Sequence, residues 1–221
     1  MPRKSLMMRM FSSIGGIFHD QVRRGKLNDD GWPKLTAAAA RLKNKPLWID
    51  ETGGLTTNQM RSRARRLQRS KGQKVDLIVV DYIQIMGNTS KENNTQRISV
   101  ISMELKRIAK EFDCPVVALS QLNRELEKRG DKRPQMSDLR DSGALEQDAD
   151  VILFLYRDEV YDDNSEYKGV AELNIAKQRN GETGKVILES QLQFCRFQDF
   201  TGSFREYKEP EKTHTEHHTR S

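Results

Sequence analysis

Two polar residues that directly follow apolar runs are the first candidates for chemistry. Asp81 comes after the run at 77–80, and Gln121 comes after the run at 116–119 and Ser120. A carboxylate at the carboxyl end of a buried parallel strand faces the crevice where open α/β sheets bind ligands, and there it can hold Mg²⁺ through water. An amide at the end of the neighbouring strand can contact the terminal phosphate of a nucleotide. Alone, Asp81 is better explained as a turn-forming or capping residue, and Gln121 is equally well explained as a buried hydrogen-bonding group. Together the two residues favour a nucleotide crevice.

The segment 138–143 mixes a cation with Ser and Gly. Arg140 can pair with a phosphate, and backbone N–H groups near Gly143 can approach one closely. A surface loop with balanced charges is the alternative interpretation of this string.

A third group of candidates lies before a turn. Lys177 and Arg179 precede Asn180 and Gly181, a pair typical of hairpin turns. Held on a rigid β-ribbon, these cations could reach a phosphate on a neighbouring molecule, as an arginine finger does. Cations beside a hairpin turn also protect sheet edges, which is the alternative. The charged residues between 61 and 74 are all basic, which fits a solvated helix face or a contact with phosphates or an acidic subunit.

These candidates need a scaffold of helices and strands. Apolar residues at helical spacing predict a helix around 6–14 and a long one over 98–112, and Thr56 with Gln59 predicts a capped helix through about Arg69. Short apolar runs predict strands at 46–49, 77–80, 116–119 and 151–155, followed by consecutive strands at 170–176, 185–188 and 194–197. Because the runs at 77–80 and 116–119 do not alternate and are joined through a helix, we expect a parallel sheet covered on both faces.

Composition limits the class of protein. The chain has 221 residues, enough for one sizeable domain, and its net charge of +6 permits a polyanionic partner. No apolar run approaches the roughly 20 residues of a membrane span, and no secretory signal opens the chain, so we expect a cytoplasmic protein without membrane contact. Cys114 and Cys195 lack the spacing of a metal site. The polar residues 206–221 predict a disordered tail.

Several motifs occur in an order that resembles one family. They are the strings at 77–82, 118–124, 138–150, 156–159 and 177–181. Together they closely resemble the C-terminal motor domain of DnaB-type replicative DNA helicases, from Met1 to about Phe200. The resemblance implies a RecA-like α/β fold: a mostly parallel sheet flanked by helices, with antiparallel strands at the C-terminal end. It also implies homo-hexameric rings that hydrolyse ATP between subunits, with Mg²⁺, while moving along single-stranded DNA.

The resemblance also implies roles for individual residues. Asp81 matches the aspartate associated with Mg²⁺ through water, and Gln121 matches the residue that senses the γ-phosphate. Arg140, Asp141 and Gly143 match the loop that holds the DNA backbone, although the family more often has Glu where this chain has Asp141. Lys177 and Arg179 match the basic pair that reaches the ATP of the neighbouring subunit.

One motif of the family is missing from this sequence. A phosphate-binding loop reads G-x-x-x-x-G-K-[ST], and neither Gly25-Lys26 nor Gly184-Lys185 continues in that way. In the family, a strand, this loop and a catalytic glutamate come before the position of Met1. We therefore expect residues 1–205 to be a partial RecA-like domain, incomplete at its N-terminus, which alone is not an active ATPase.

The expected function is that of the C-terminal portion of an ATP-dependent replicative helicase that unwinds duplex DNA, with primase and a helicase loader as possible partners. Two alternatives stay open: a non-catalytic module that binds DNA or a helicase, and a RecA-like recombination ATPase.

Overall fold

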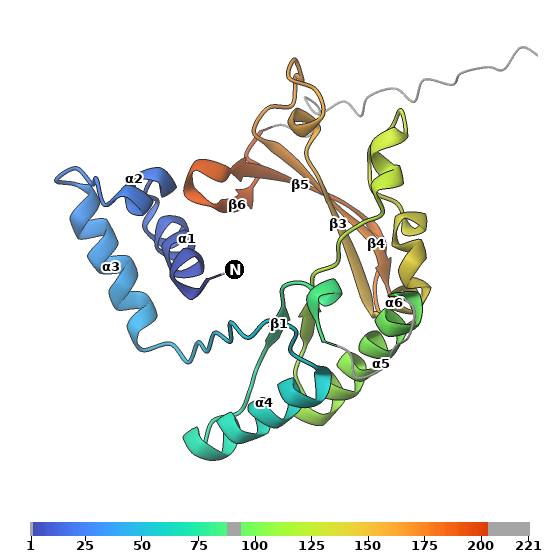
Figure 1. Cartoon of the computed structure of the whole chain (residues 1–221). Coiled ribbons are helices and arrows are strands. Elements are labelled where there is room, and N and C mark those ends of the chain that lie inside the picture. Colours follow the sequence, from blue (N-terminus) through green and yellow to red (C-terminus); the bar gives the residue numbers. More distant parts are fainter. Residues whose placement is uncertain (1, 88–93, 203–221) are drawn as a thin grey trace, which may run out of the picture.

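The structure is a computed structural model in which residues 2–87 and 94–202 are described (Figure 1). The expected tail at 206–221 lies outside the described residues. None of the described helices is long and apolar enough to cross a bilayer.

Three helices form the N-terminal part: α1 (Arg3–Gly15), α2 (His19–Arg24) and α3 (Gly31–Lys43). The helix expected around 6–14 is α1, which ends where Gly16 takes a positive φ of 60°. These helices lie apart from α4 and α5 and contact the segment around residues 192–199 instead (Figure 1). The rings of Phe18 and Phe194 are 5.0 Å apart at their centroids, and Arg196 Nη1 donates to the Ser13 carbonyl at 3.4 Å.

The central part is a small parallel α/β unit made of α4 (Thr57–Lys71), β1 (Ile78–Val80), the short 3₁₀ segment η1 (Ile83–Ile85), α5 (Asn94–Phe112) and β2 (Val116–Ala118). The predicted capping box of α4 is present, with the Gln59 N–H donating to Thr56 Oγ1 at 3.2 Å. β1 and β2 pair in parallel, with Ile78 opposite Val116 and Val80 opposite Ala118. The predicted apolar stripe of α5 is buried against this pair and forms the core.

The C-terminal part carries an antiparallel sheet. It follows η2 (Arg124–Lys128), η3 (Met136–Ser142) and the short helix α6 (Gly143–Asp148). Its strands are β3 (Val151–Tyr156), β4 (Val170–Gln178), β5 (Gly184–Gln191) and β6 (Arg196–Asp199), with η4 (Asp158–Val160) and η5 (Leu192–Phe194) between them. The strands are ordered β3-β4-β5-β6, each antiparallel to the next. The turn expected at Asn180 and Gly181 joins β4 to β5, although neither residue takes a positive φ there.

The prediction of a strand at 46–49 is wrong. These residues form no strand, and Leu47 and Trp48 are exposed. An apolar run becomes a strand only where another strand offers its N–H and C=O groups. No described strand pairs with residues 46–49.

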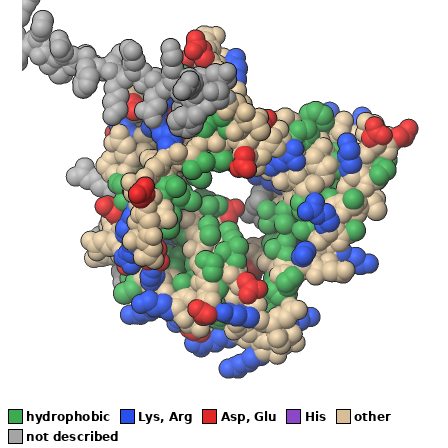
Figure 2. Space-filling view, turned by 180° about the vertical axis from the view of Figure 1, so that it is seen from behind, with side chains coloured by type: hydrophobic (Ala, Val, Ile, Leu, Met, Phe, Trp, Pro, Cys, Tyr) green, Lys and Arg blue, Asp and Glu red, His purple; other side chains and the backbone are tan. Residues whose placement is uncertain are grey.

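The expectation that the parallel sheet is covered on both faces is also wrong for the described residues. Val80 on β1 is buried, while its neighbour Val79 is 58% exposed. Further exposed apolar residues lie on or beside β1 and β2 (Leu77, Val117 and Leu119) and on β3 of the other sheet (Val151, Leu153 and Leu155). We call this set the open apolar face. Seen from behind, hydrophobic side chains gather around a hollow in the molecule (Figure 2).

Candidate functional site

Asp81 and Gln121 lie at the same edge of the parallel sheet. Val80 pairs with Ala118, and the pairing continues past the strands: the Leu119 N–H donates to the Val80 carbonyl at 2.9 Å, and the Ile83 N–H donates to the Leu119 carbonyl at 3.0 Å. Asp81 and Gln121 are both exposed. The parallel arrangement therefore brings the two polar ends to one edge, as their sequence positions predicted.

A third residue, Gln84, holds the backbone at Gln121. Its side-chain oxygen accepts from the Gln121 N–H at 3.2 Å, and its Nε2 donates to the Gln121 carbonyl at 3.2 Å and to Ser120 Oγ at 3.0 Å. Arg97 in turn donates to the Gln84 carbonyl at 3.1 Å. Gln84 was not among the residues predicted from the sequence, where the available signal was a lone amide between the apolar Ile83 and Ile85.

The two candidate side chains are open to a ligand. Within residues 2–87 and 94–202, neither the Asp81 carboxylate nor the Gln121 side-chain amide makes a hydrogen bond or ion pair. The same residues contain no cluster of three or more potential metal ligands. A single exposed carboxylate fits a Mg²⁺ ion that keeps much of its water and takes further oxygens from phosphates, and it does not fit an ion held by protein ligands alone.

The segment 138–143 is tied down through its first residues. Asp138 is buried, and its Oδ2 accepts from Arg129 Nη2 at 2.9 Å and from the Gln135 N–H at 2.7 Å. The next residue, Leu139, packs against Ile152 and Phe154 of β3. The backbone passes through the end of η3 and enters α6 at Gly143, which is exposed. The side chains of Arg140 and Asp141 lie outside the described part.

An ion cluster anchors the chain just before this segment. Glu172 on β4 is buried and accepts from Arg133 Nη2 at 2.6 Å and from Arg133 Nε at 3.1 Å, while Lys185 Nζ lies 2.9 Å from its other oxygen. The Arg133 guanidinium also lies over the Tyr156 ring, 4.6 Å from the centroid. Arg129 connects the two anchors, because its Nη2 also donates to the Arg133 carbonyl at 2.7 Å.

Lys177 and Arg179 contact the end of α6. Lys177 Nζ donates to the Glu146 and Gln147 carbonyls, and Arg179 Nη2 donates to the Gln147 carbonyl at 2.6 Å. Arg179 Nη1 also donates to Asp150 Oδ1 at 3.1 Å. No described hydrogen bond or ion pair connects these cations to Asp81 or Gln121, so the structure forms two separate groups of candidate residues.

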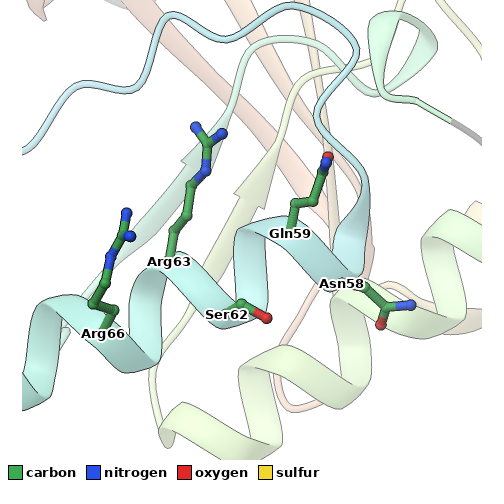
Figure 3. A pocket seen from close by; sticks show the side chains of 5 residues that line it. All are labelled: Asn58, Gln59, Ser62, Arg63 and Arg66. Atoms are coloured by element: carbon green, nitrogen blue, oxygen red, sulfur yellow. The ribbon is translucent and has the colours of Figure 1, made fainter.

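Three of the six cations of the basic helix α4 pair with carboxylates among the described residues. Arg61 pairs with Glu104 at 2.6 Å, Arg65 with Glu111 at 2.5 Å, and Arg63 with Asp50 at 2.5 Å. The hydrogen bond from Arg63 is the main reason that the pKa of Asp50 falls to about 2. A hollow of 480 Å³ lies on this helix, where Gln59, Arg63 and Arg66 project to the same side (Figure 3). Because Arg63 is already engaged, this hollow is a weaker candidate site than the sheet edge.

Comparison with known proteins adds a family to this geometry. The family described as "DnaB-like helicase C terminal domain" matches residues 1–199. The "Replicative DNA helicase DnaB" of Haemophilus influenzae is 50% identical over 212 residues, which cover 95% of this chain and 45% of that protein. The "Replicative DNA helicase DnaC" of Bacillus subtilis is 45% identical over 199 residues, or 89% of this chain and 43% of that protein. The chain thus spans less than half the length of these curated relatives.

Solved structures agree in fold. One of them, described as an ATPase domain, superimposes with a TM-score of 0.85 at 39% identity, covering 90% of this chain and 72% of that one. A DnaB-like replicative helicase, described with its interactions with primase, gives a TM-score of 0.85 at 38% identity, covering 90% of this chain and 48% of that one. The α/β fold with one parallel and one antiparallel sheet is that of a RecA-like helicase ATPase domain. With its family model, its relatives and its fold in agreement, the chain belongs to the family of DnaB-like helicase C-terminal domains.

Proposed function

We propose that this chain is the C-terminal part of an ATP-dependent replicative DNA helicase that works as a hexameric ring on single-stranded DNA and unwinds duplex DNA. The observation that carries the proposal is the meeting of Asp81 and Gln121, both without side-chain partners among the described residues, at the carboxyl edge of a parallel sheet in a member of this family. Ligands of open α/β sheets bind at this edge.

The two residues have different tasks in this proposal. When bound, Mg²⁺ neutralises charge on the phosphates of ATP, and the Asp81 carboxylate holds the ion through water. Gln121 contacts the γ-phosphate. Gln84 supports this task, because it holds the backbone at Gln121 from both sides and leaves the side-chain amide to the nucleotide.

Lys177 and Arg179 act on the ATP of a neighbouring subunit. Their contacts with the end of α6 separate them from Asp81 and Gln121 of the same chain. In a ring, head-to-tail contacts supply every site with a neighbour, so one subunit can offer these cations to the next.

The open apolar face supports the proposal that this chain is part of a larger domain. An exposed patch of this extent marks a contact surface, and more than a quarter of the solved ATPase domain has no counterpart here, since the chain covers 72% of it. In this proposal residues 1–205 form part of the ATPase domain, and the rest of the domain covers the open apolar face and supplies the phosphate-binding loop. The 221 residues alone therefore do not hydrolyse ATP.

The DNA contact falls on Arg140, Asp141 and Gly143. The buried Asp138 and the Glu172–Arg133 pair support it, because they fix the backbone from which this segment extends. Contacts with phosphates give affinity that does not depend on sequence. Primase and a helicase loader are the proposed protein partners, in the cytoplasm; one structural neighbour is itself described with primase.

The test uses the hexameric helicase that carries this motor sequence. Asp81→Asn is expected to lower ATP hydrolysis by at least about 100-fold, the scale of removing one transition-state contact. Asp76→Asn is the matched control, since Asp76 is an exposed carboxylate just before the same strand. Equal activity of the two variants would contradict the assignment. Full DNA binding by a ring without any ATPase activity would favour the second candidate, a non-catalytic module, which rests on the missing phosphate-binding loop motif.

A further inference from the structure

The carboxyl end of α6 is held by two cations from β4 and the turn after it. Lys177 donates to the Glu146 and Gln147 carbonyls, and Arg179 donates to the Gln147 carbonyl and to Asp150. The Arg179 N–H also donates to the Asp150 carbonyl at 2.9 Å. The last carbonyls of a helix lack partners within the helix, and cations are favourable there. Lys177 and Arg179 therefore form a cap on α6, which we call the α6 cap.

The capped helix is continuous with the segment proposed to hold DNA. α6 begins at Gly143 and ends at Asp148, so little more than one helical turn separates that segment from the cap. The same end of α6 is tied to α5, because Ser102 Oγ donates to Asp148 Oδ2 at 2.7 Å and Lys106 pairs with Asp150. A change at the cap is therefore transmitted over a short, packed distance.

Asp150 links the two sides of the cap. Its carboxylate pairs with Lys106 of α5 and with Arg179. The hydrogen bond from Lys106 contributes most to lowering the pKa of Asp150, and the charges of Lys106, Arg179 and Lys177 lower it further. Asp150 is thus a charged anchor between α5, α6 and the end of β4.

The cap and a nucleotide compete for the same groups. Arg179 uses Nη1 for Asp150 and Nη2 for the Gln147 carbonyl. A guanidinium grips a phosphate through these same N–H groups in a planar fork. An end-on grip of a phosphate through both Nη atoms therefore competes with the contacts that hold Arg179 at the end of α6.

We propose that Asp150 is a positioning residue that holds Arg179 on α6 until a neighbouring nucleotide draws the cation away, and that this exchange links ATP at the subunit interface to the DNA-binding segment. The inference rests on the proposed function for the ATP and DNA ends of the link. By reciprocity, tighter engagement of the nucleotide loosens α6, and a more firmly held α6 retains Arg179.

The ion pair between Arg179 and Asp150 is weak enough to be replaced by a contact with a phosphate. The Arg179 and Asp150 side chains are 47% and 55% exposed. Exposed ion pairs are weak and depend on geometry, so a triphosphate can outcompete this one. A deeply buried pair would resist release.

The first test needs neither ATP nor DNA. Hydrogen exchange is measured in the 221-residue chain and in its Asp150→Ala and Arg179→Ala variants. We expect amide exchange across 143–149 to rise about threefold in each, the scale of one exposed charge contact at a helix end. In the double variant we expect the same rise without addition, because both residues act through one cap. Lys168→Ala removes an exposed cation from another part of the fold and is the control. Unchanged exchange in both single variants would overturn the inference, whatever the ring does with ATP.

The second test separates positioning from structure. In the hexameric helicase, Asp150→Asn is expected to raise ATP hydrolysis without DNA by about threefold, because Arg179 is released, and to reduce the stimulation by single-stranded DNA. Asp150→Glu is expected to keep the wild-type ratio. A purely structural role would lower both rates together, and that result would overturn the inference. Asp81→Asn tests the proposed function separately, so the two failures are distinguishable.

Discussion

The ion cluster around Glu172 offers a quantitative test of how the segment 138–143, which we propose holds DNA, is anchored. Glu172→Gln keeps the shape of the side chain but removes the charge that faces Arg133 and Lys185. Breaking a fully buried ion pair on one side costs about 3–5 kcal/mol, because the remaining charge stays unpaired. The glutamate side chain is 5% exposed, but Arg133 and Lys185 keep 22% and 24% exposure and can recover some hydration. We therefore expect a loss of about 2–3 kcal/mol in the free energy of unfolding.

The assay is urea unfolding of the 221-residue chain, followed by circular dichroism and by the fluorescence of its tryptophans. Asp20→Asn is the control: its carboxylate pairs with Arg23 and Arg24 on an exposed helix, so the unfolding midpoint should not move. A double-mutant cycle with Arg133→Gln should show strong coupling, because both changes remove the same contact between Glu172 and Arg133. A Glu172→Gln variant as stable as the Asp20→Asn control would refute the anchoring role.

Three further predictions address stability and DNA binding. Val79→Thr on the open apolar face should change the free energy of unfolding by less than about 0.5 kcal/mol. Val80→Thr on the buried side should lower it by about 1–3 kcal/mol, because it buries a hydroxyl. Equal effects of the two substitutions in urea unfolding would contradict the exposure of Val79. Because the pKa of Asp50 is lowered to about 2, its pairing with Arg63 adds stability above the ordinary value of 3.8 and loses it as the pH falls toward 2. The midpoint difference between the wild type and Asp50→Asn should therefore vanish across that window, and a difference that persisted below it would contradict the pairing. Arg140→Ala in the ring should weaken single-strand binding equally for different sequences and reduce the salt slope by about one; an effect limited to one base composition would contradict a phosphate contact.

Local patterns predicted the elements that depend on neighbours in sequence. The capping box at Thr56 and the stripe of α5 follow from residues a few positions apart, and both are present. The parallel pairing of β1 and β2, which brings Asp81 and Gln121 to one edge, also followed from two non-alternating apolar runs joined through a helix.

Features that depend on distant residues could not be predicted in this way. The run at 46–49 has the composition of a strand, but strand formation needs a partner edge, which the sequence does not reveal. Val79 and Leu153 belong to apolar runs and were therefore expected to be buried, but both are exposed. Which face of a strand is covered depends on the elements that pack against it, and these are distant in sequence. The contact of Arg179 with Gln147 and Asp150 depends on the register of β4 against β3. Lys177 and Arg179 were recognised from the sequence as a basic pair, but their contacts with the end of α6 in the same subunit were not predicted.

The most direct test of the central claim is ATP hydrolysis by mixed hexamers. Rings of Asp81→Asn subunits and rings of Arg179→Ala subunits are each expected to be nearly inactive, with Arg179→Ala about 10³-fold or more below wild type while binding nucleotide. In mixed rings, an Arg179→Ala subunit keeps its Asp81, and an adjacent Asp81→Asn subunit supplies an intact Arg179. About a quarter of the interfaces in an equal, random mixture then carry both residues, because each head-to-tail interface draws on two subunits. Mixing is therefore expected to restore hydrolysis; mixed rings that assemble and stay inactive would contradict a site shared between subunits.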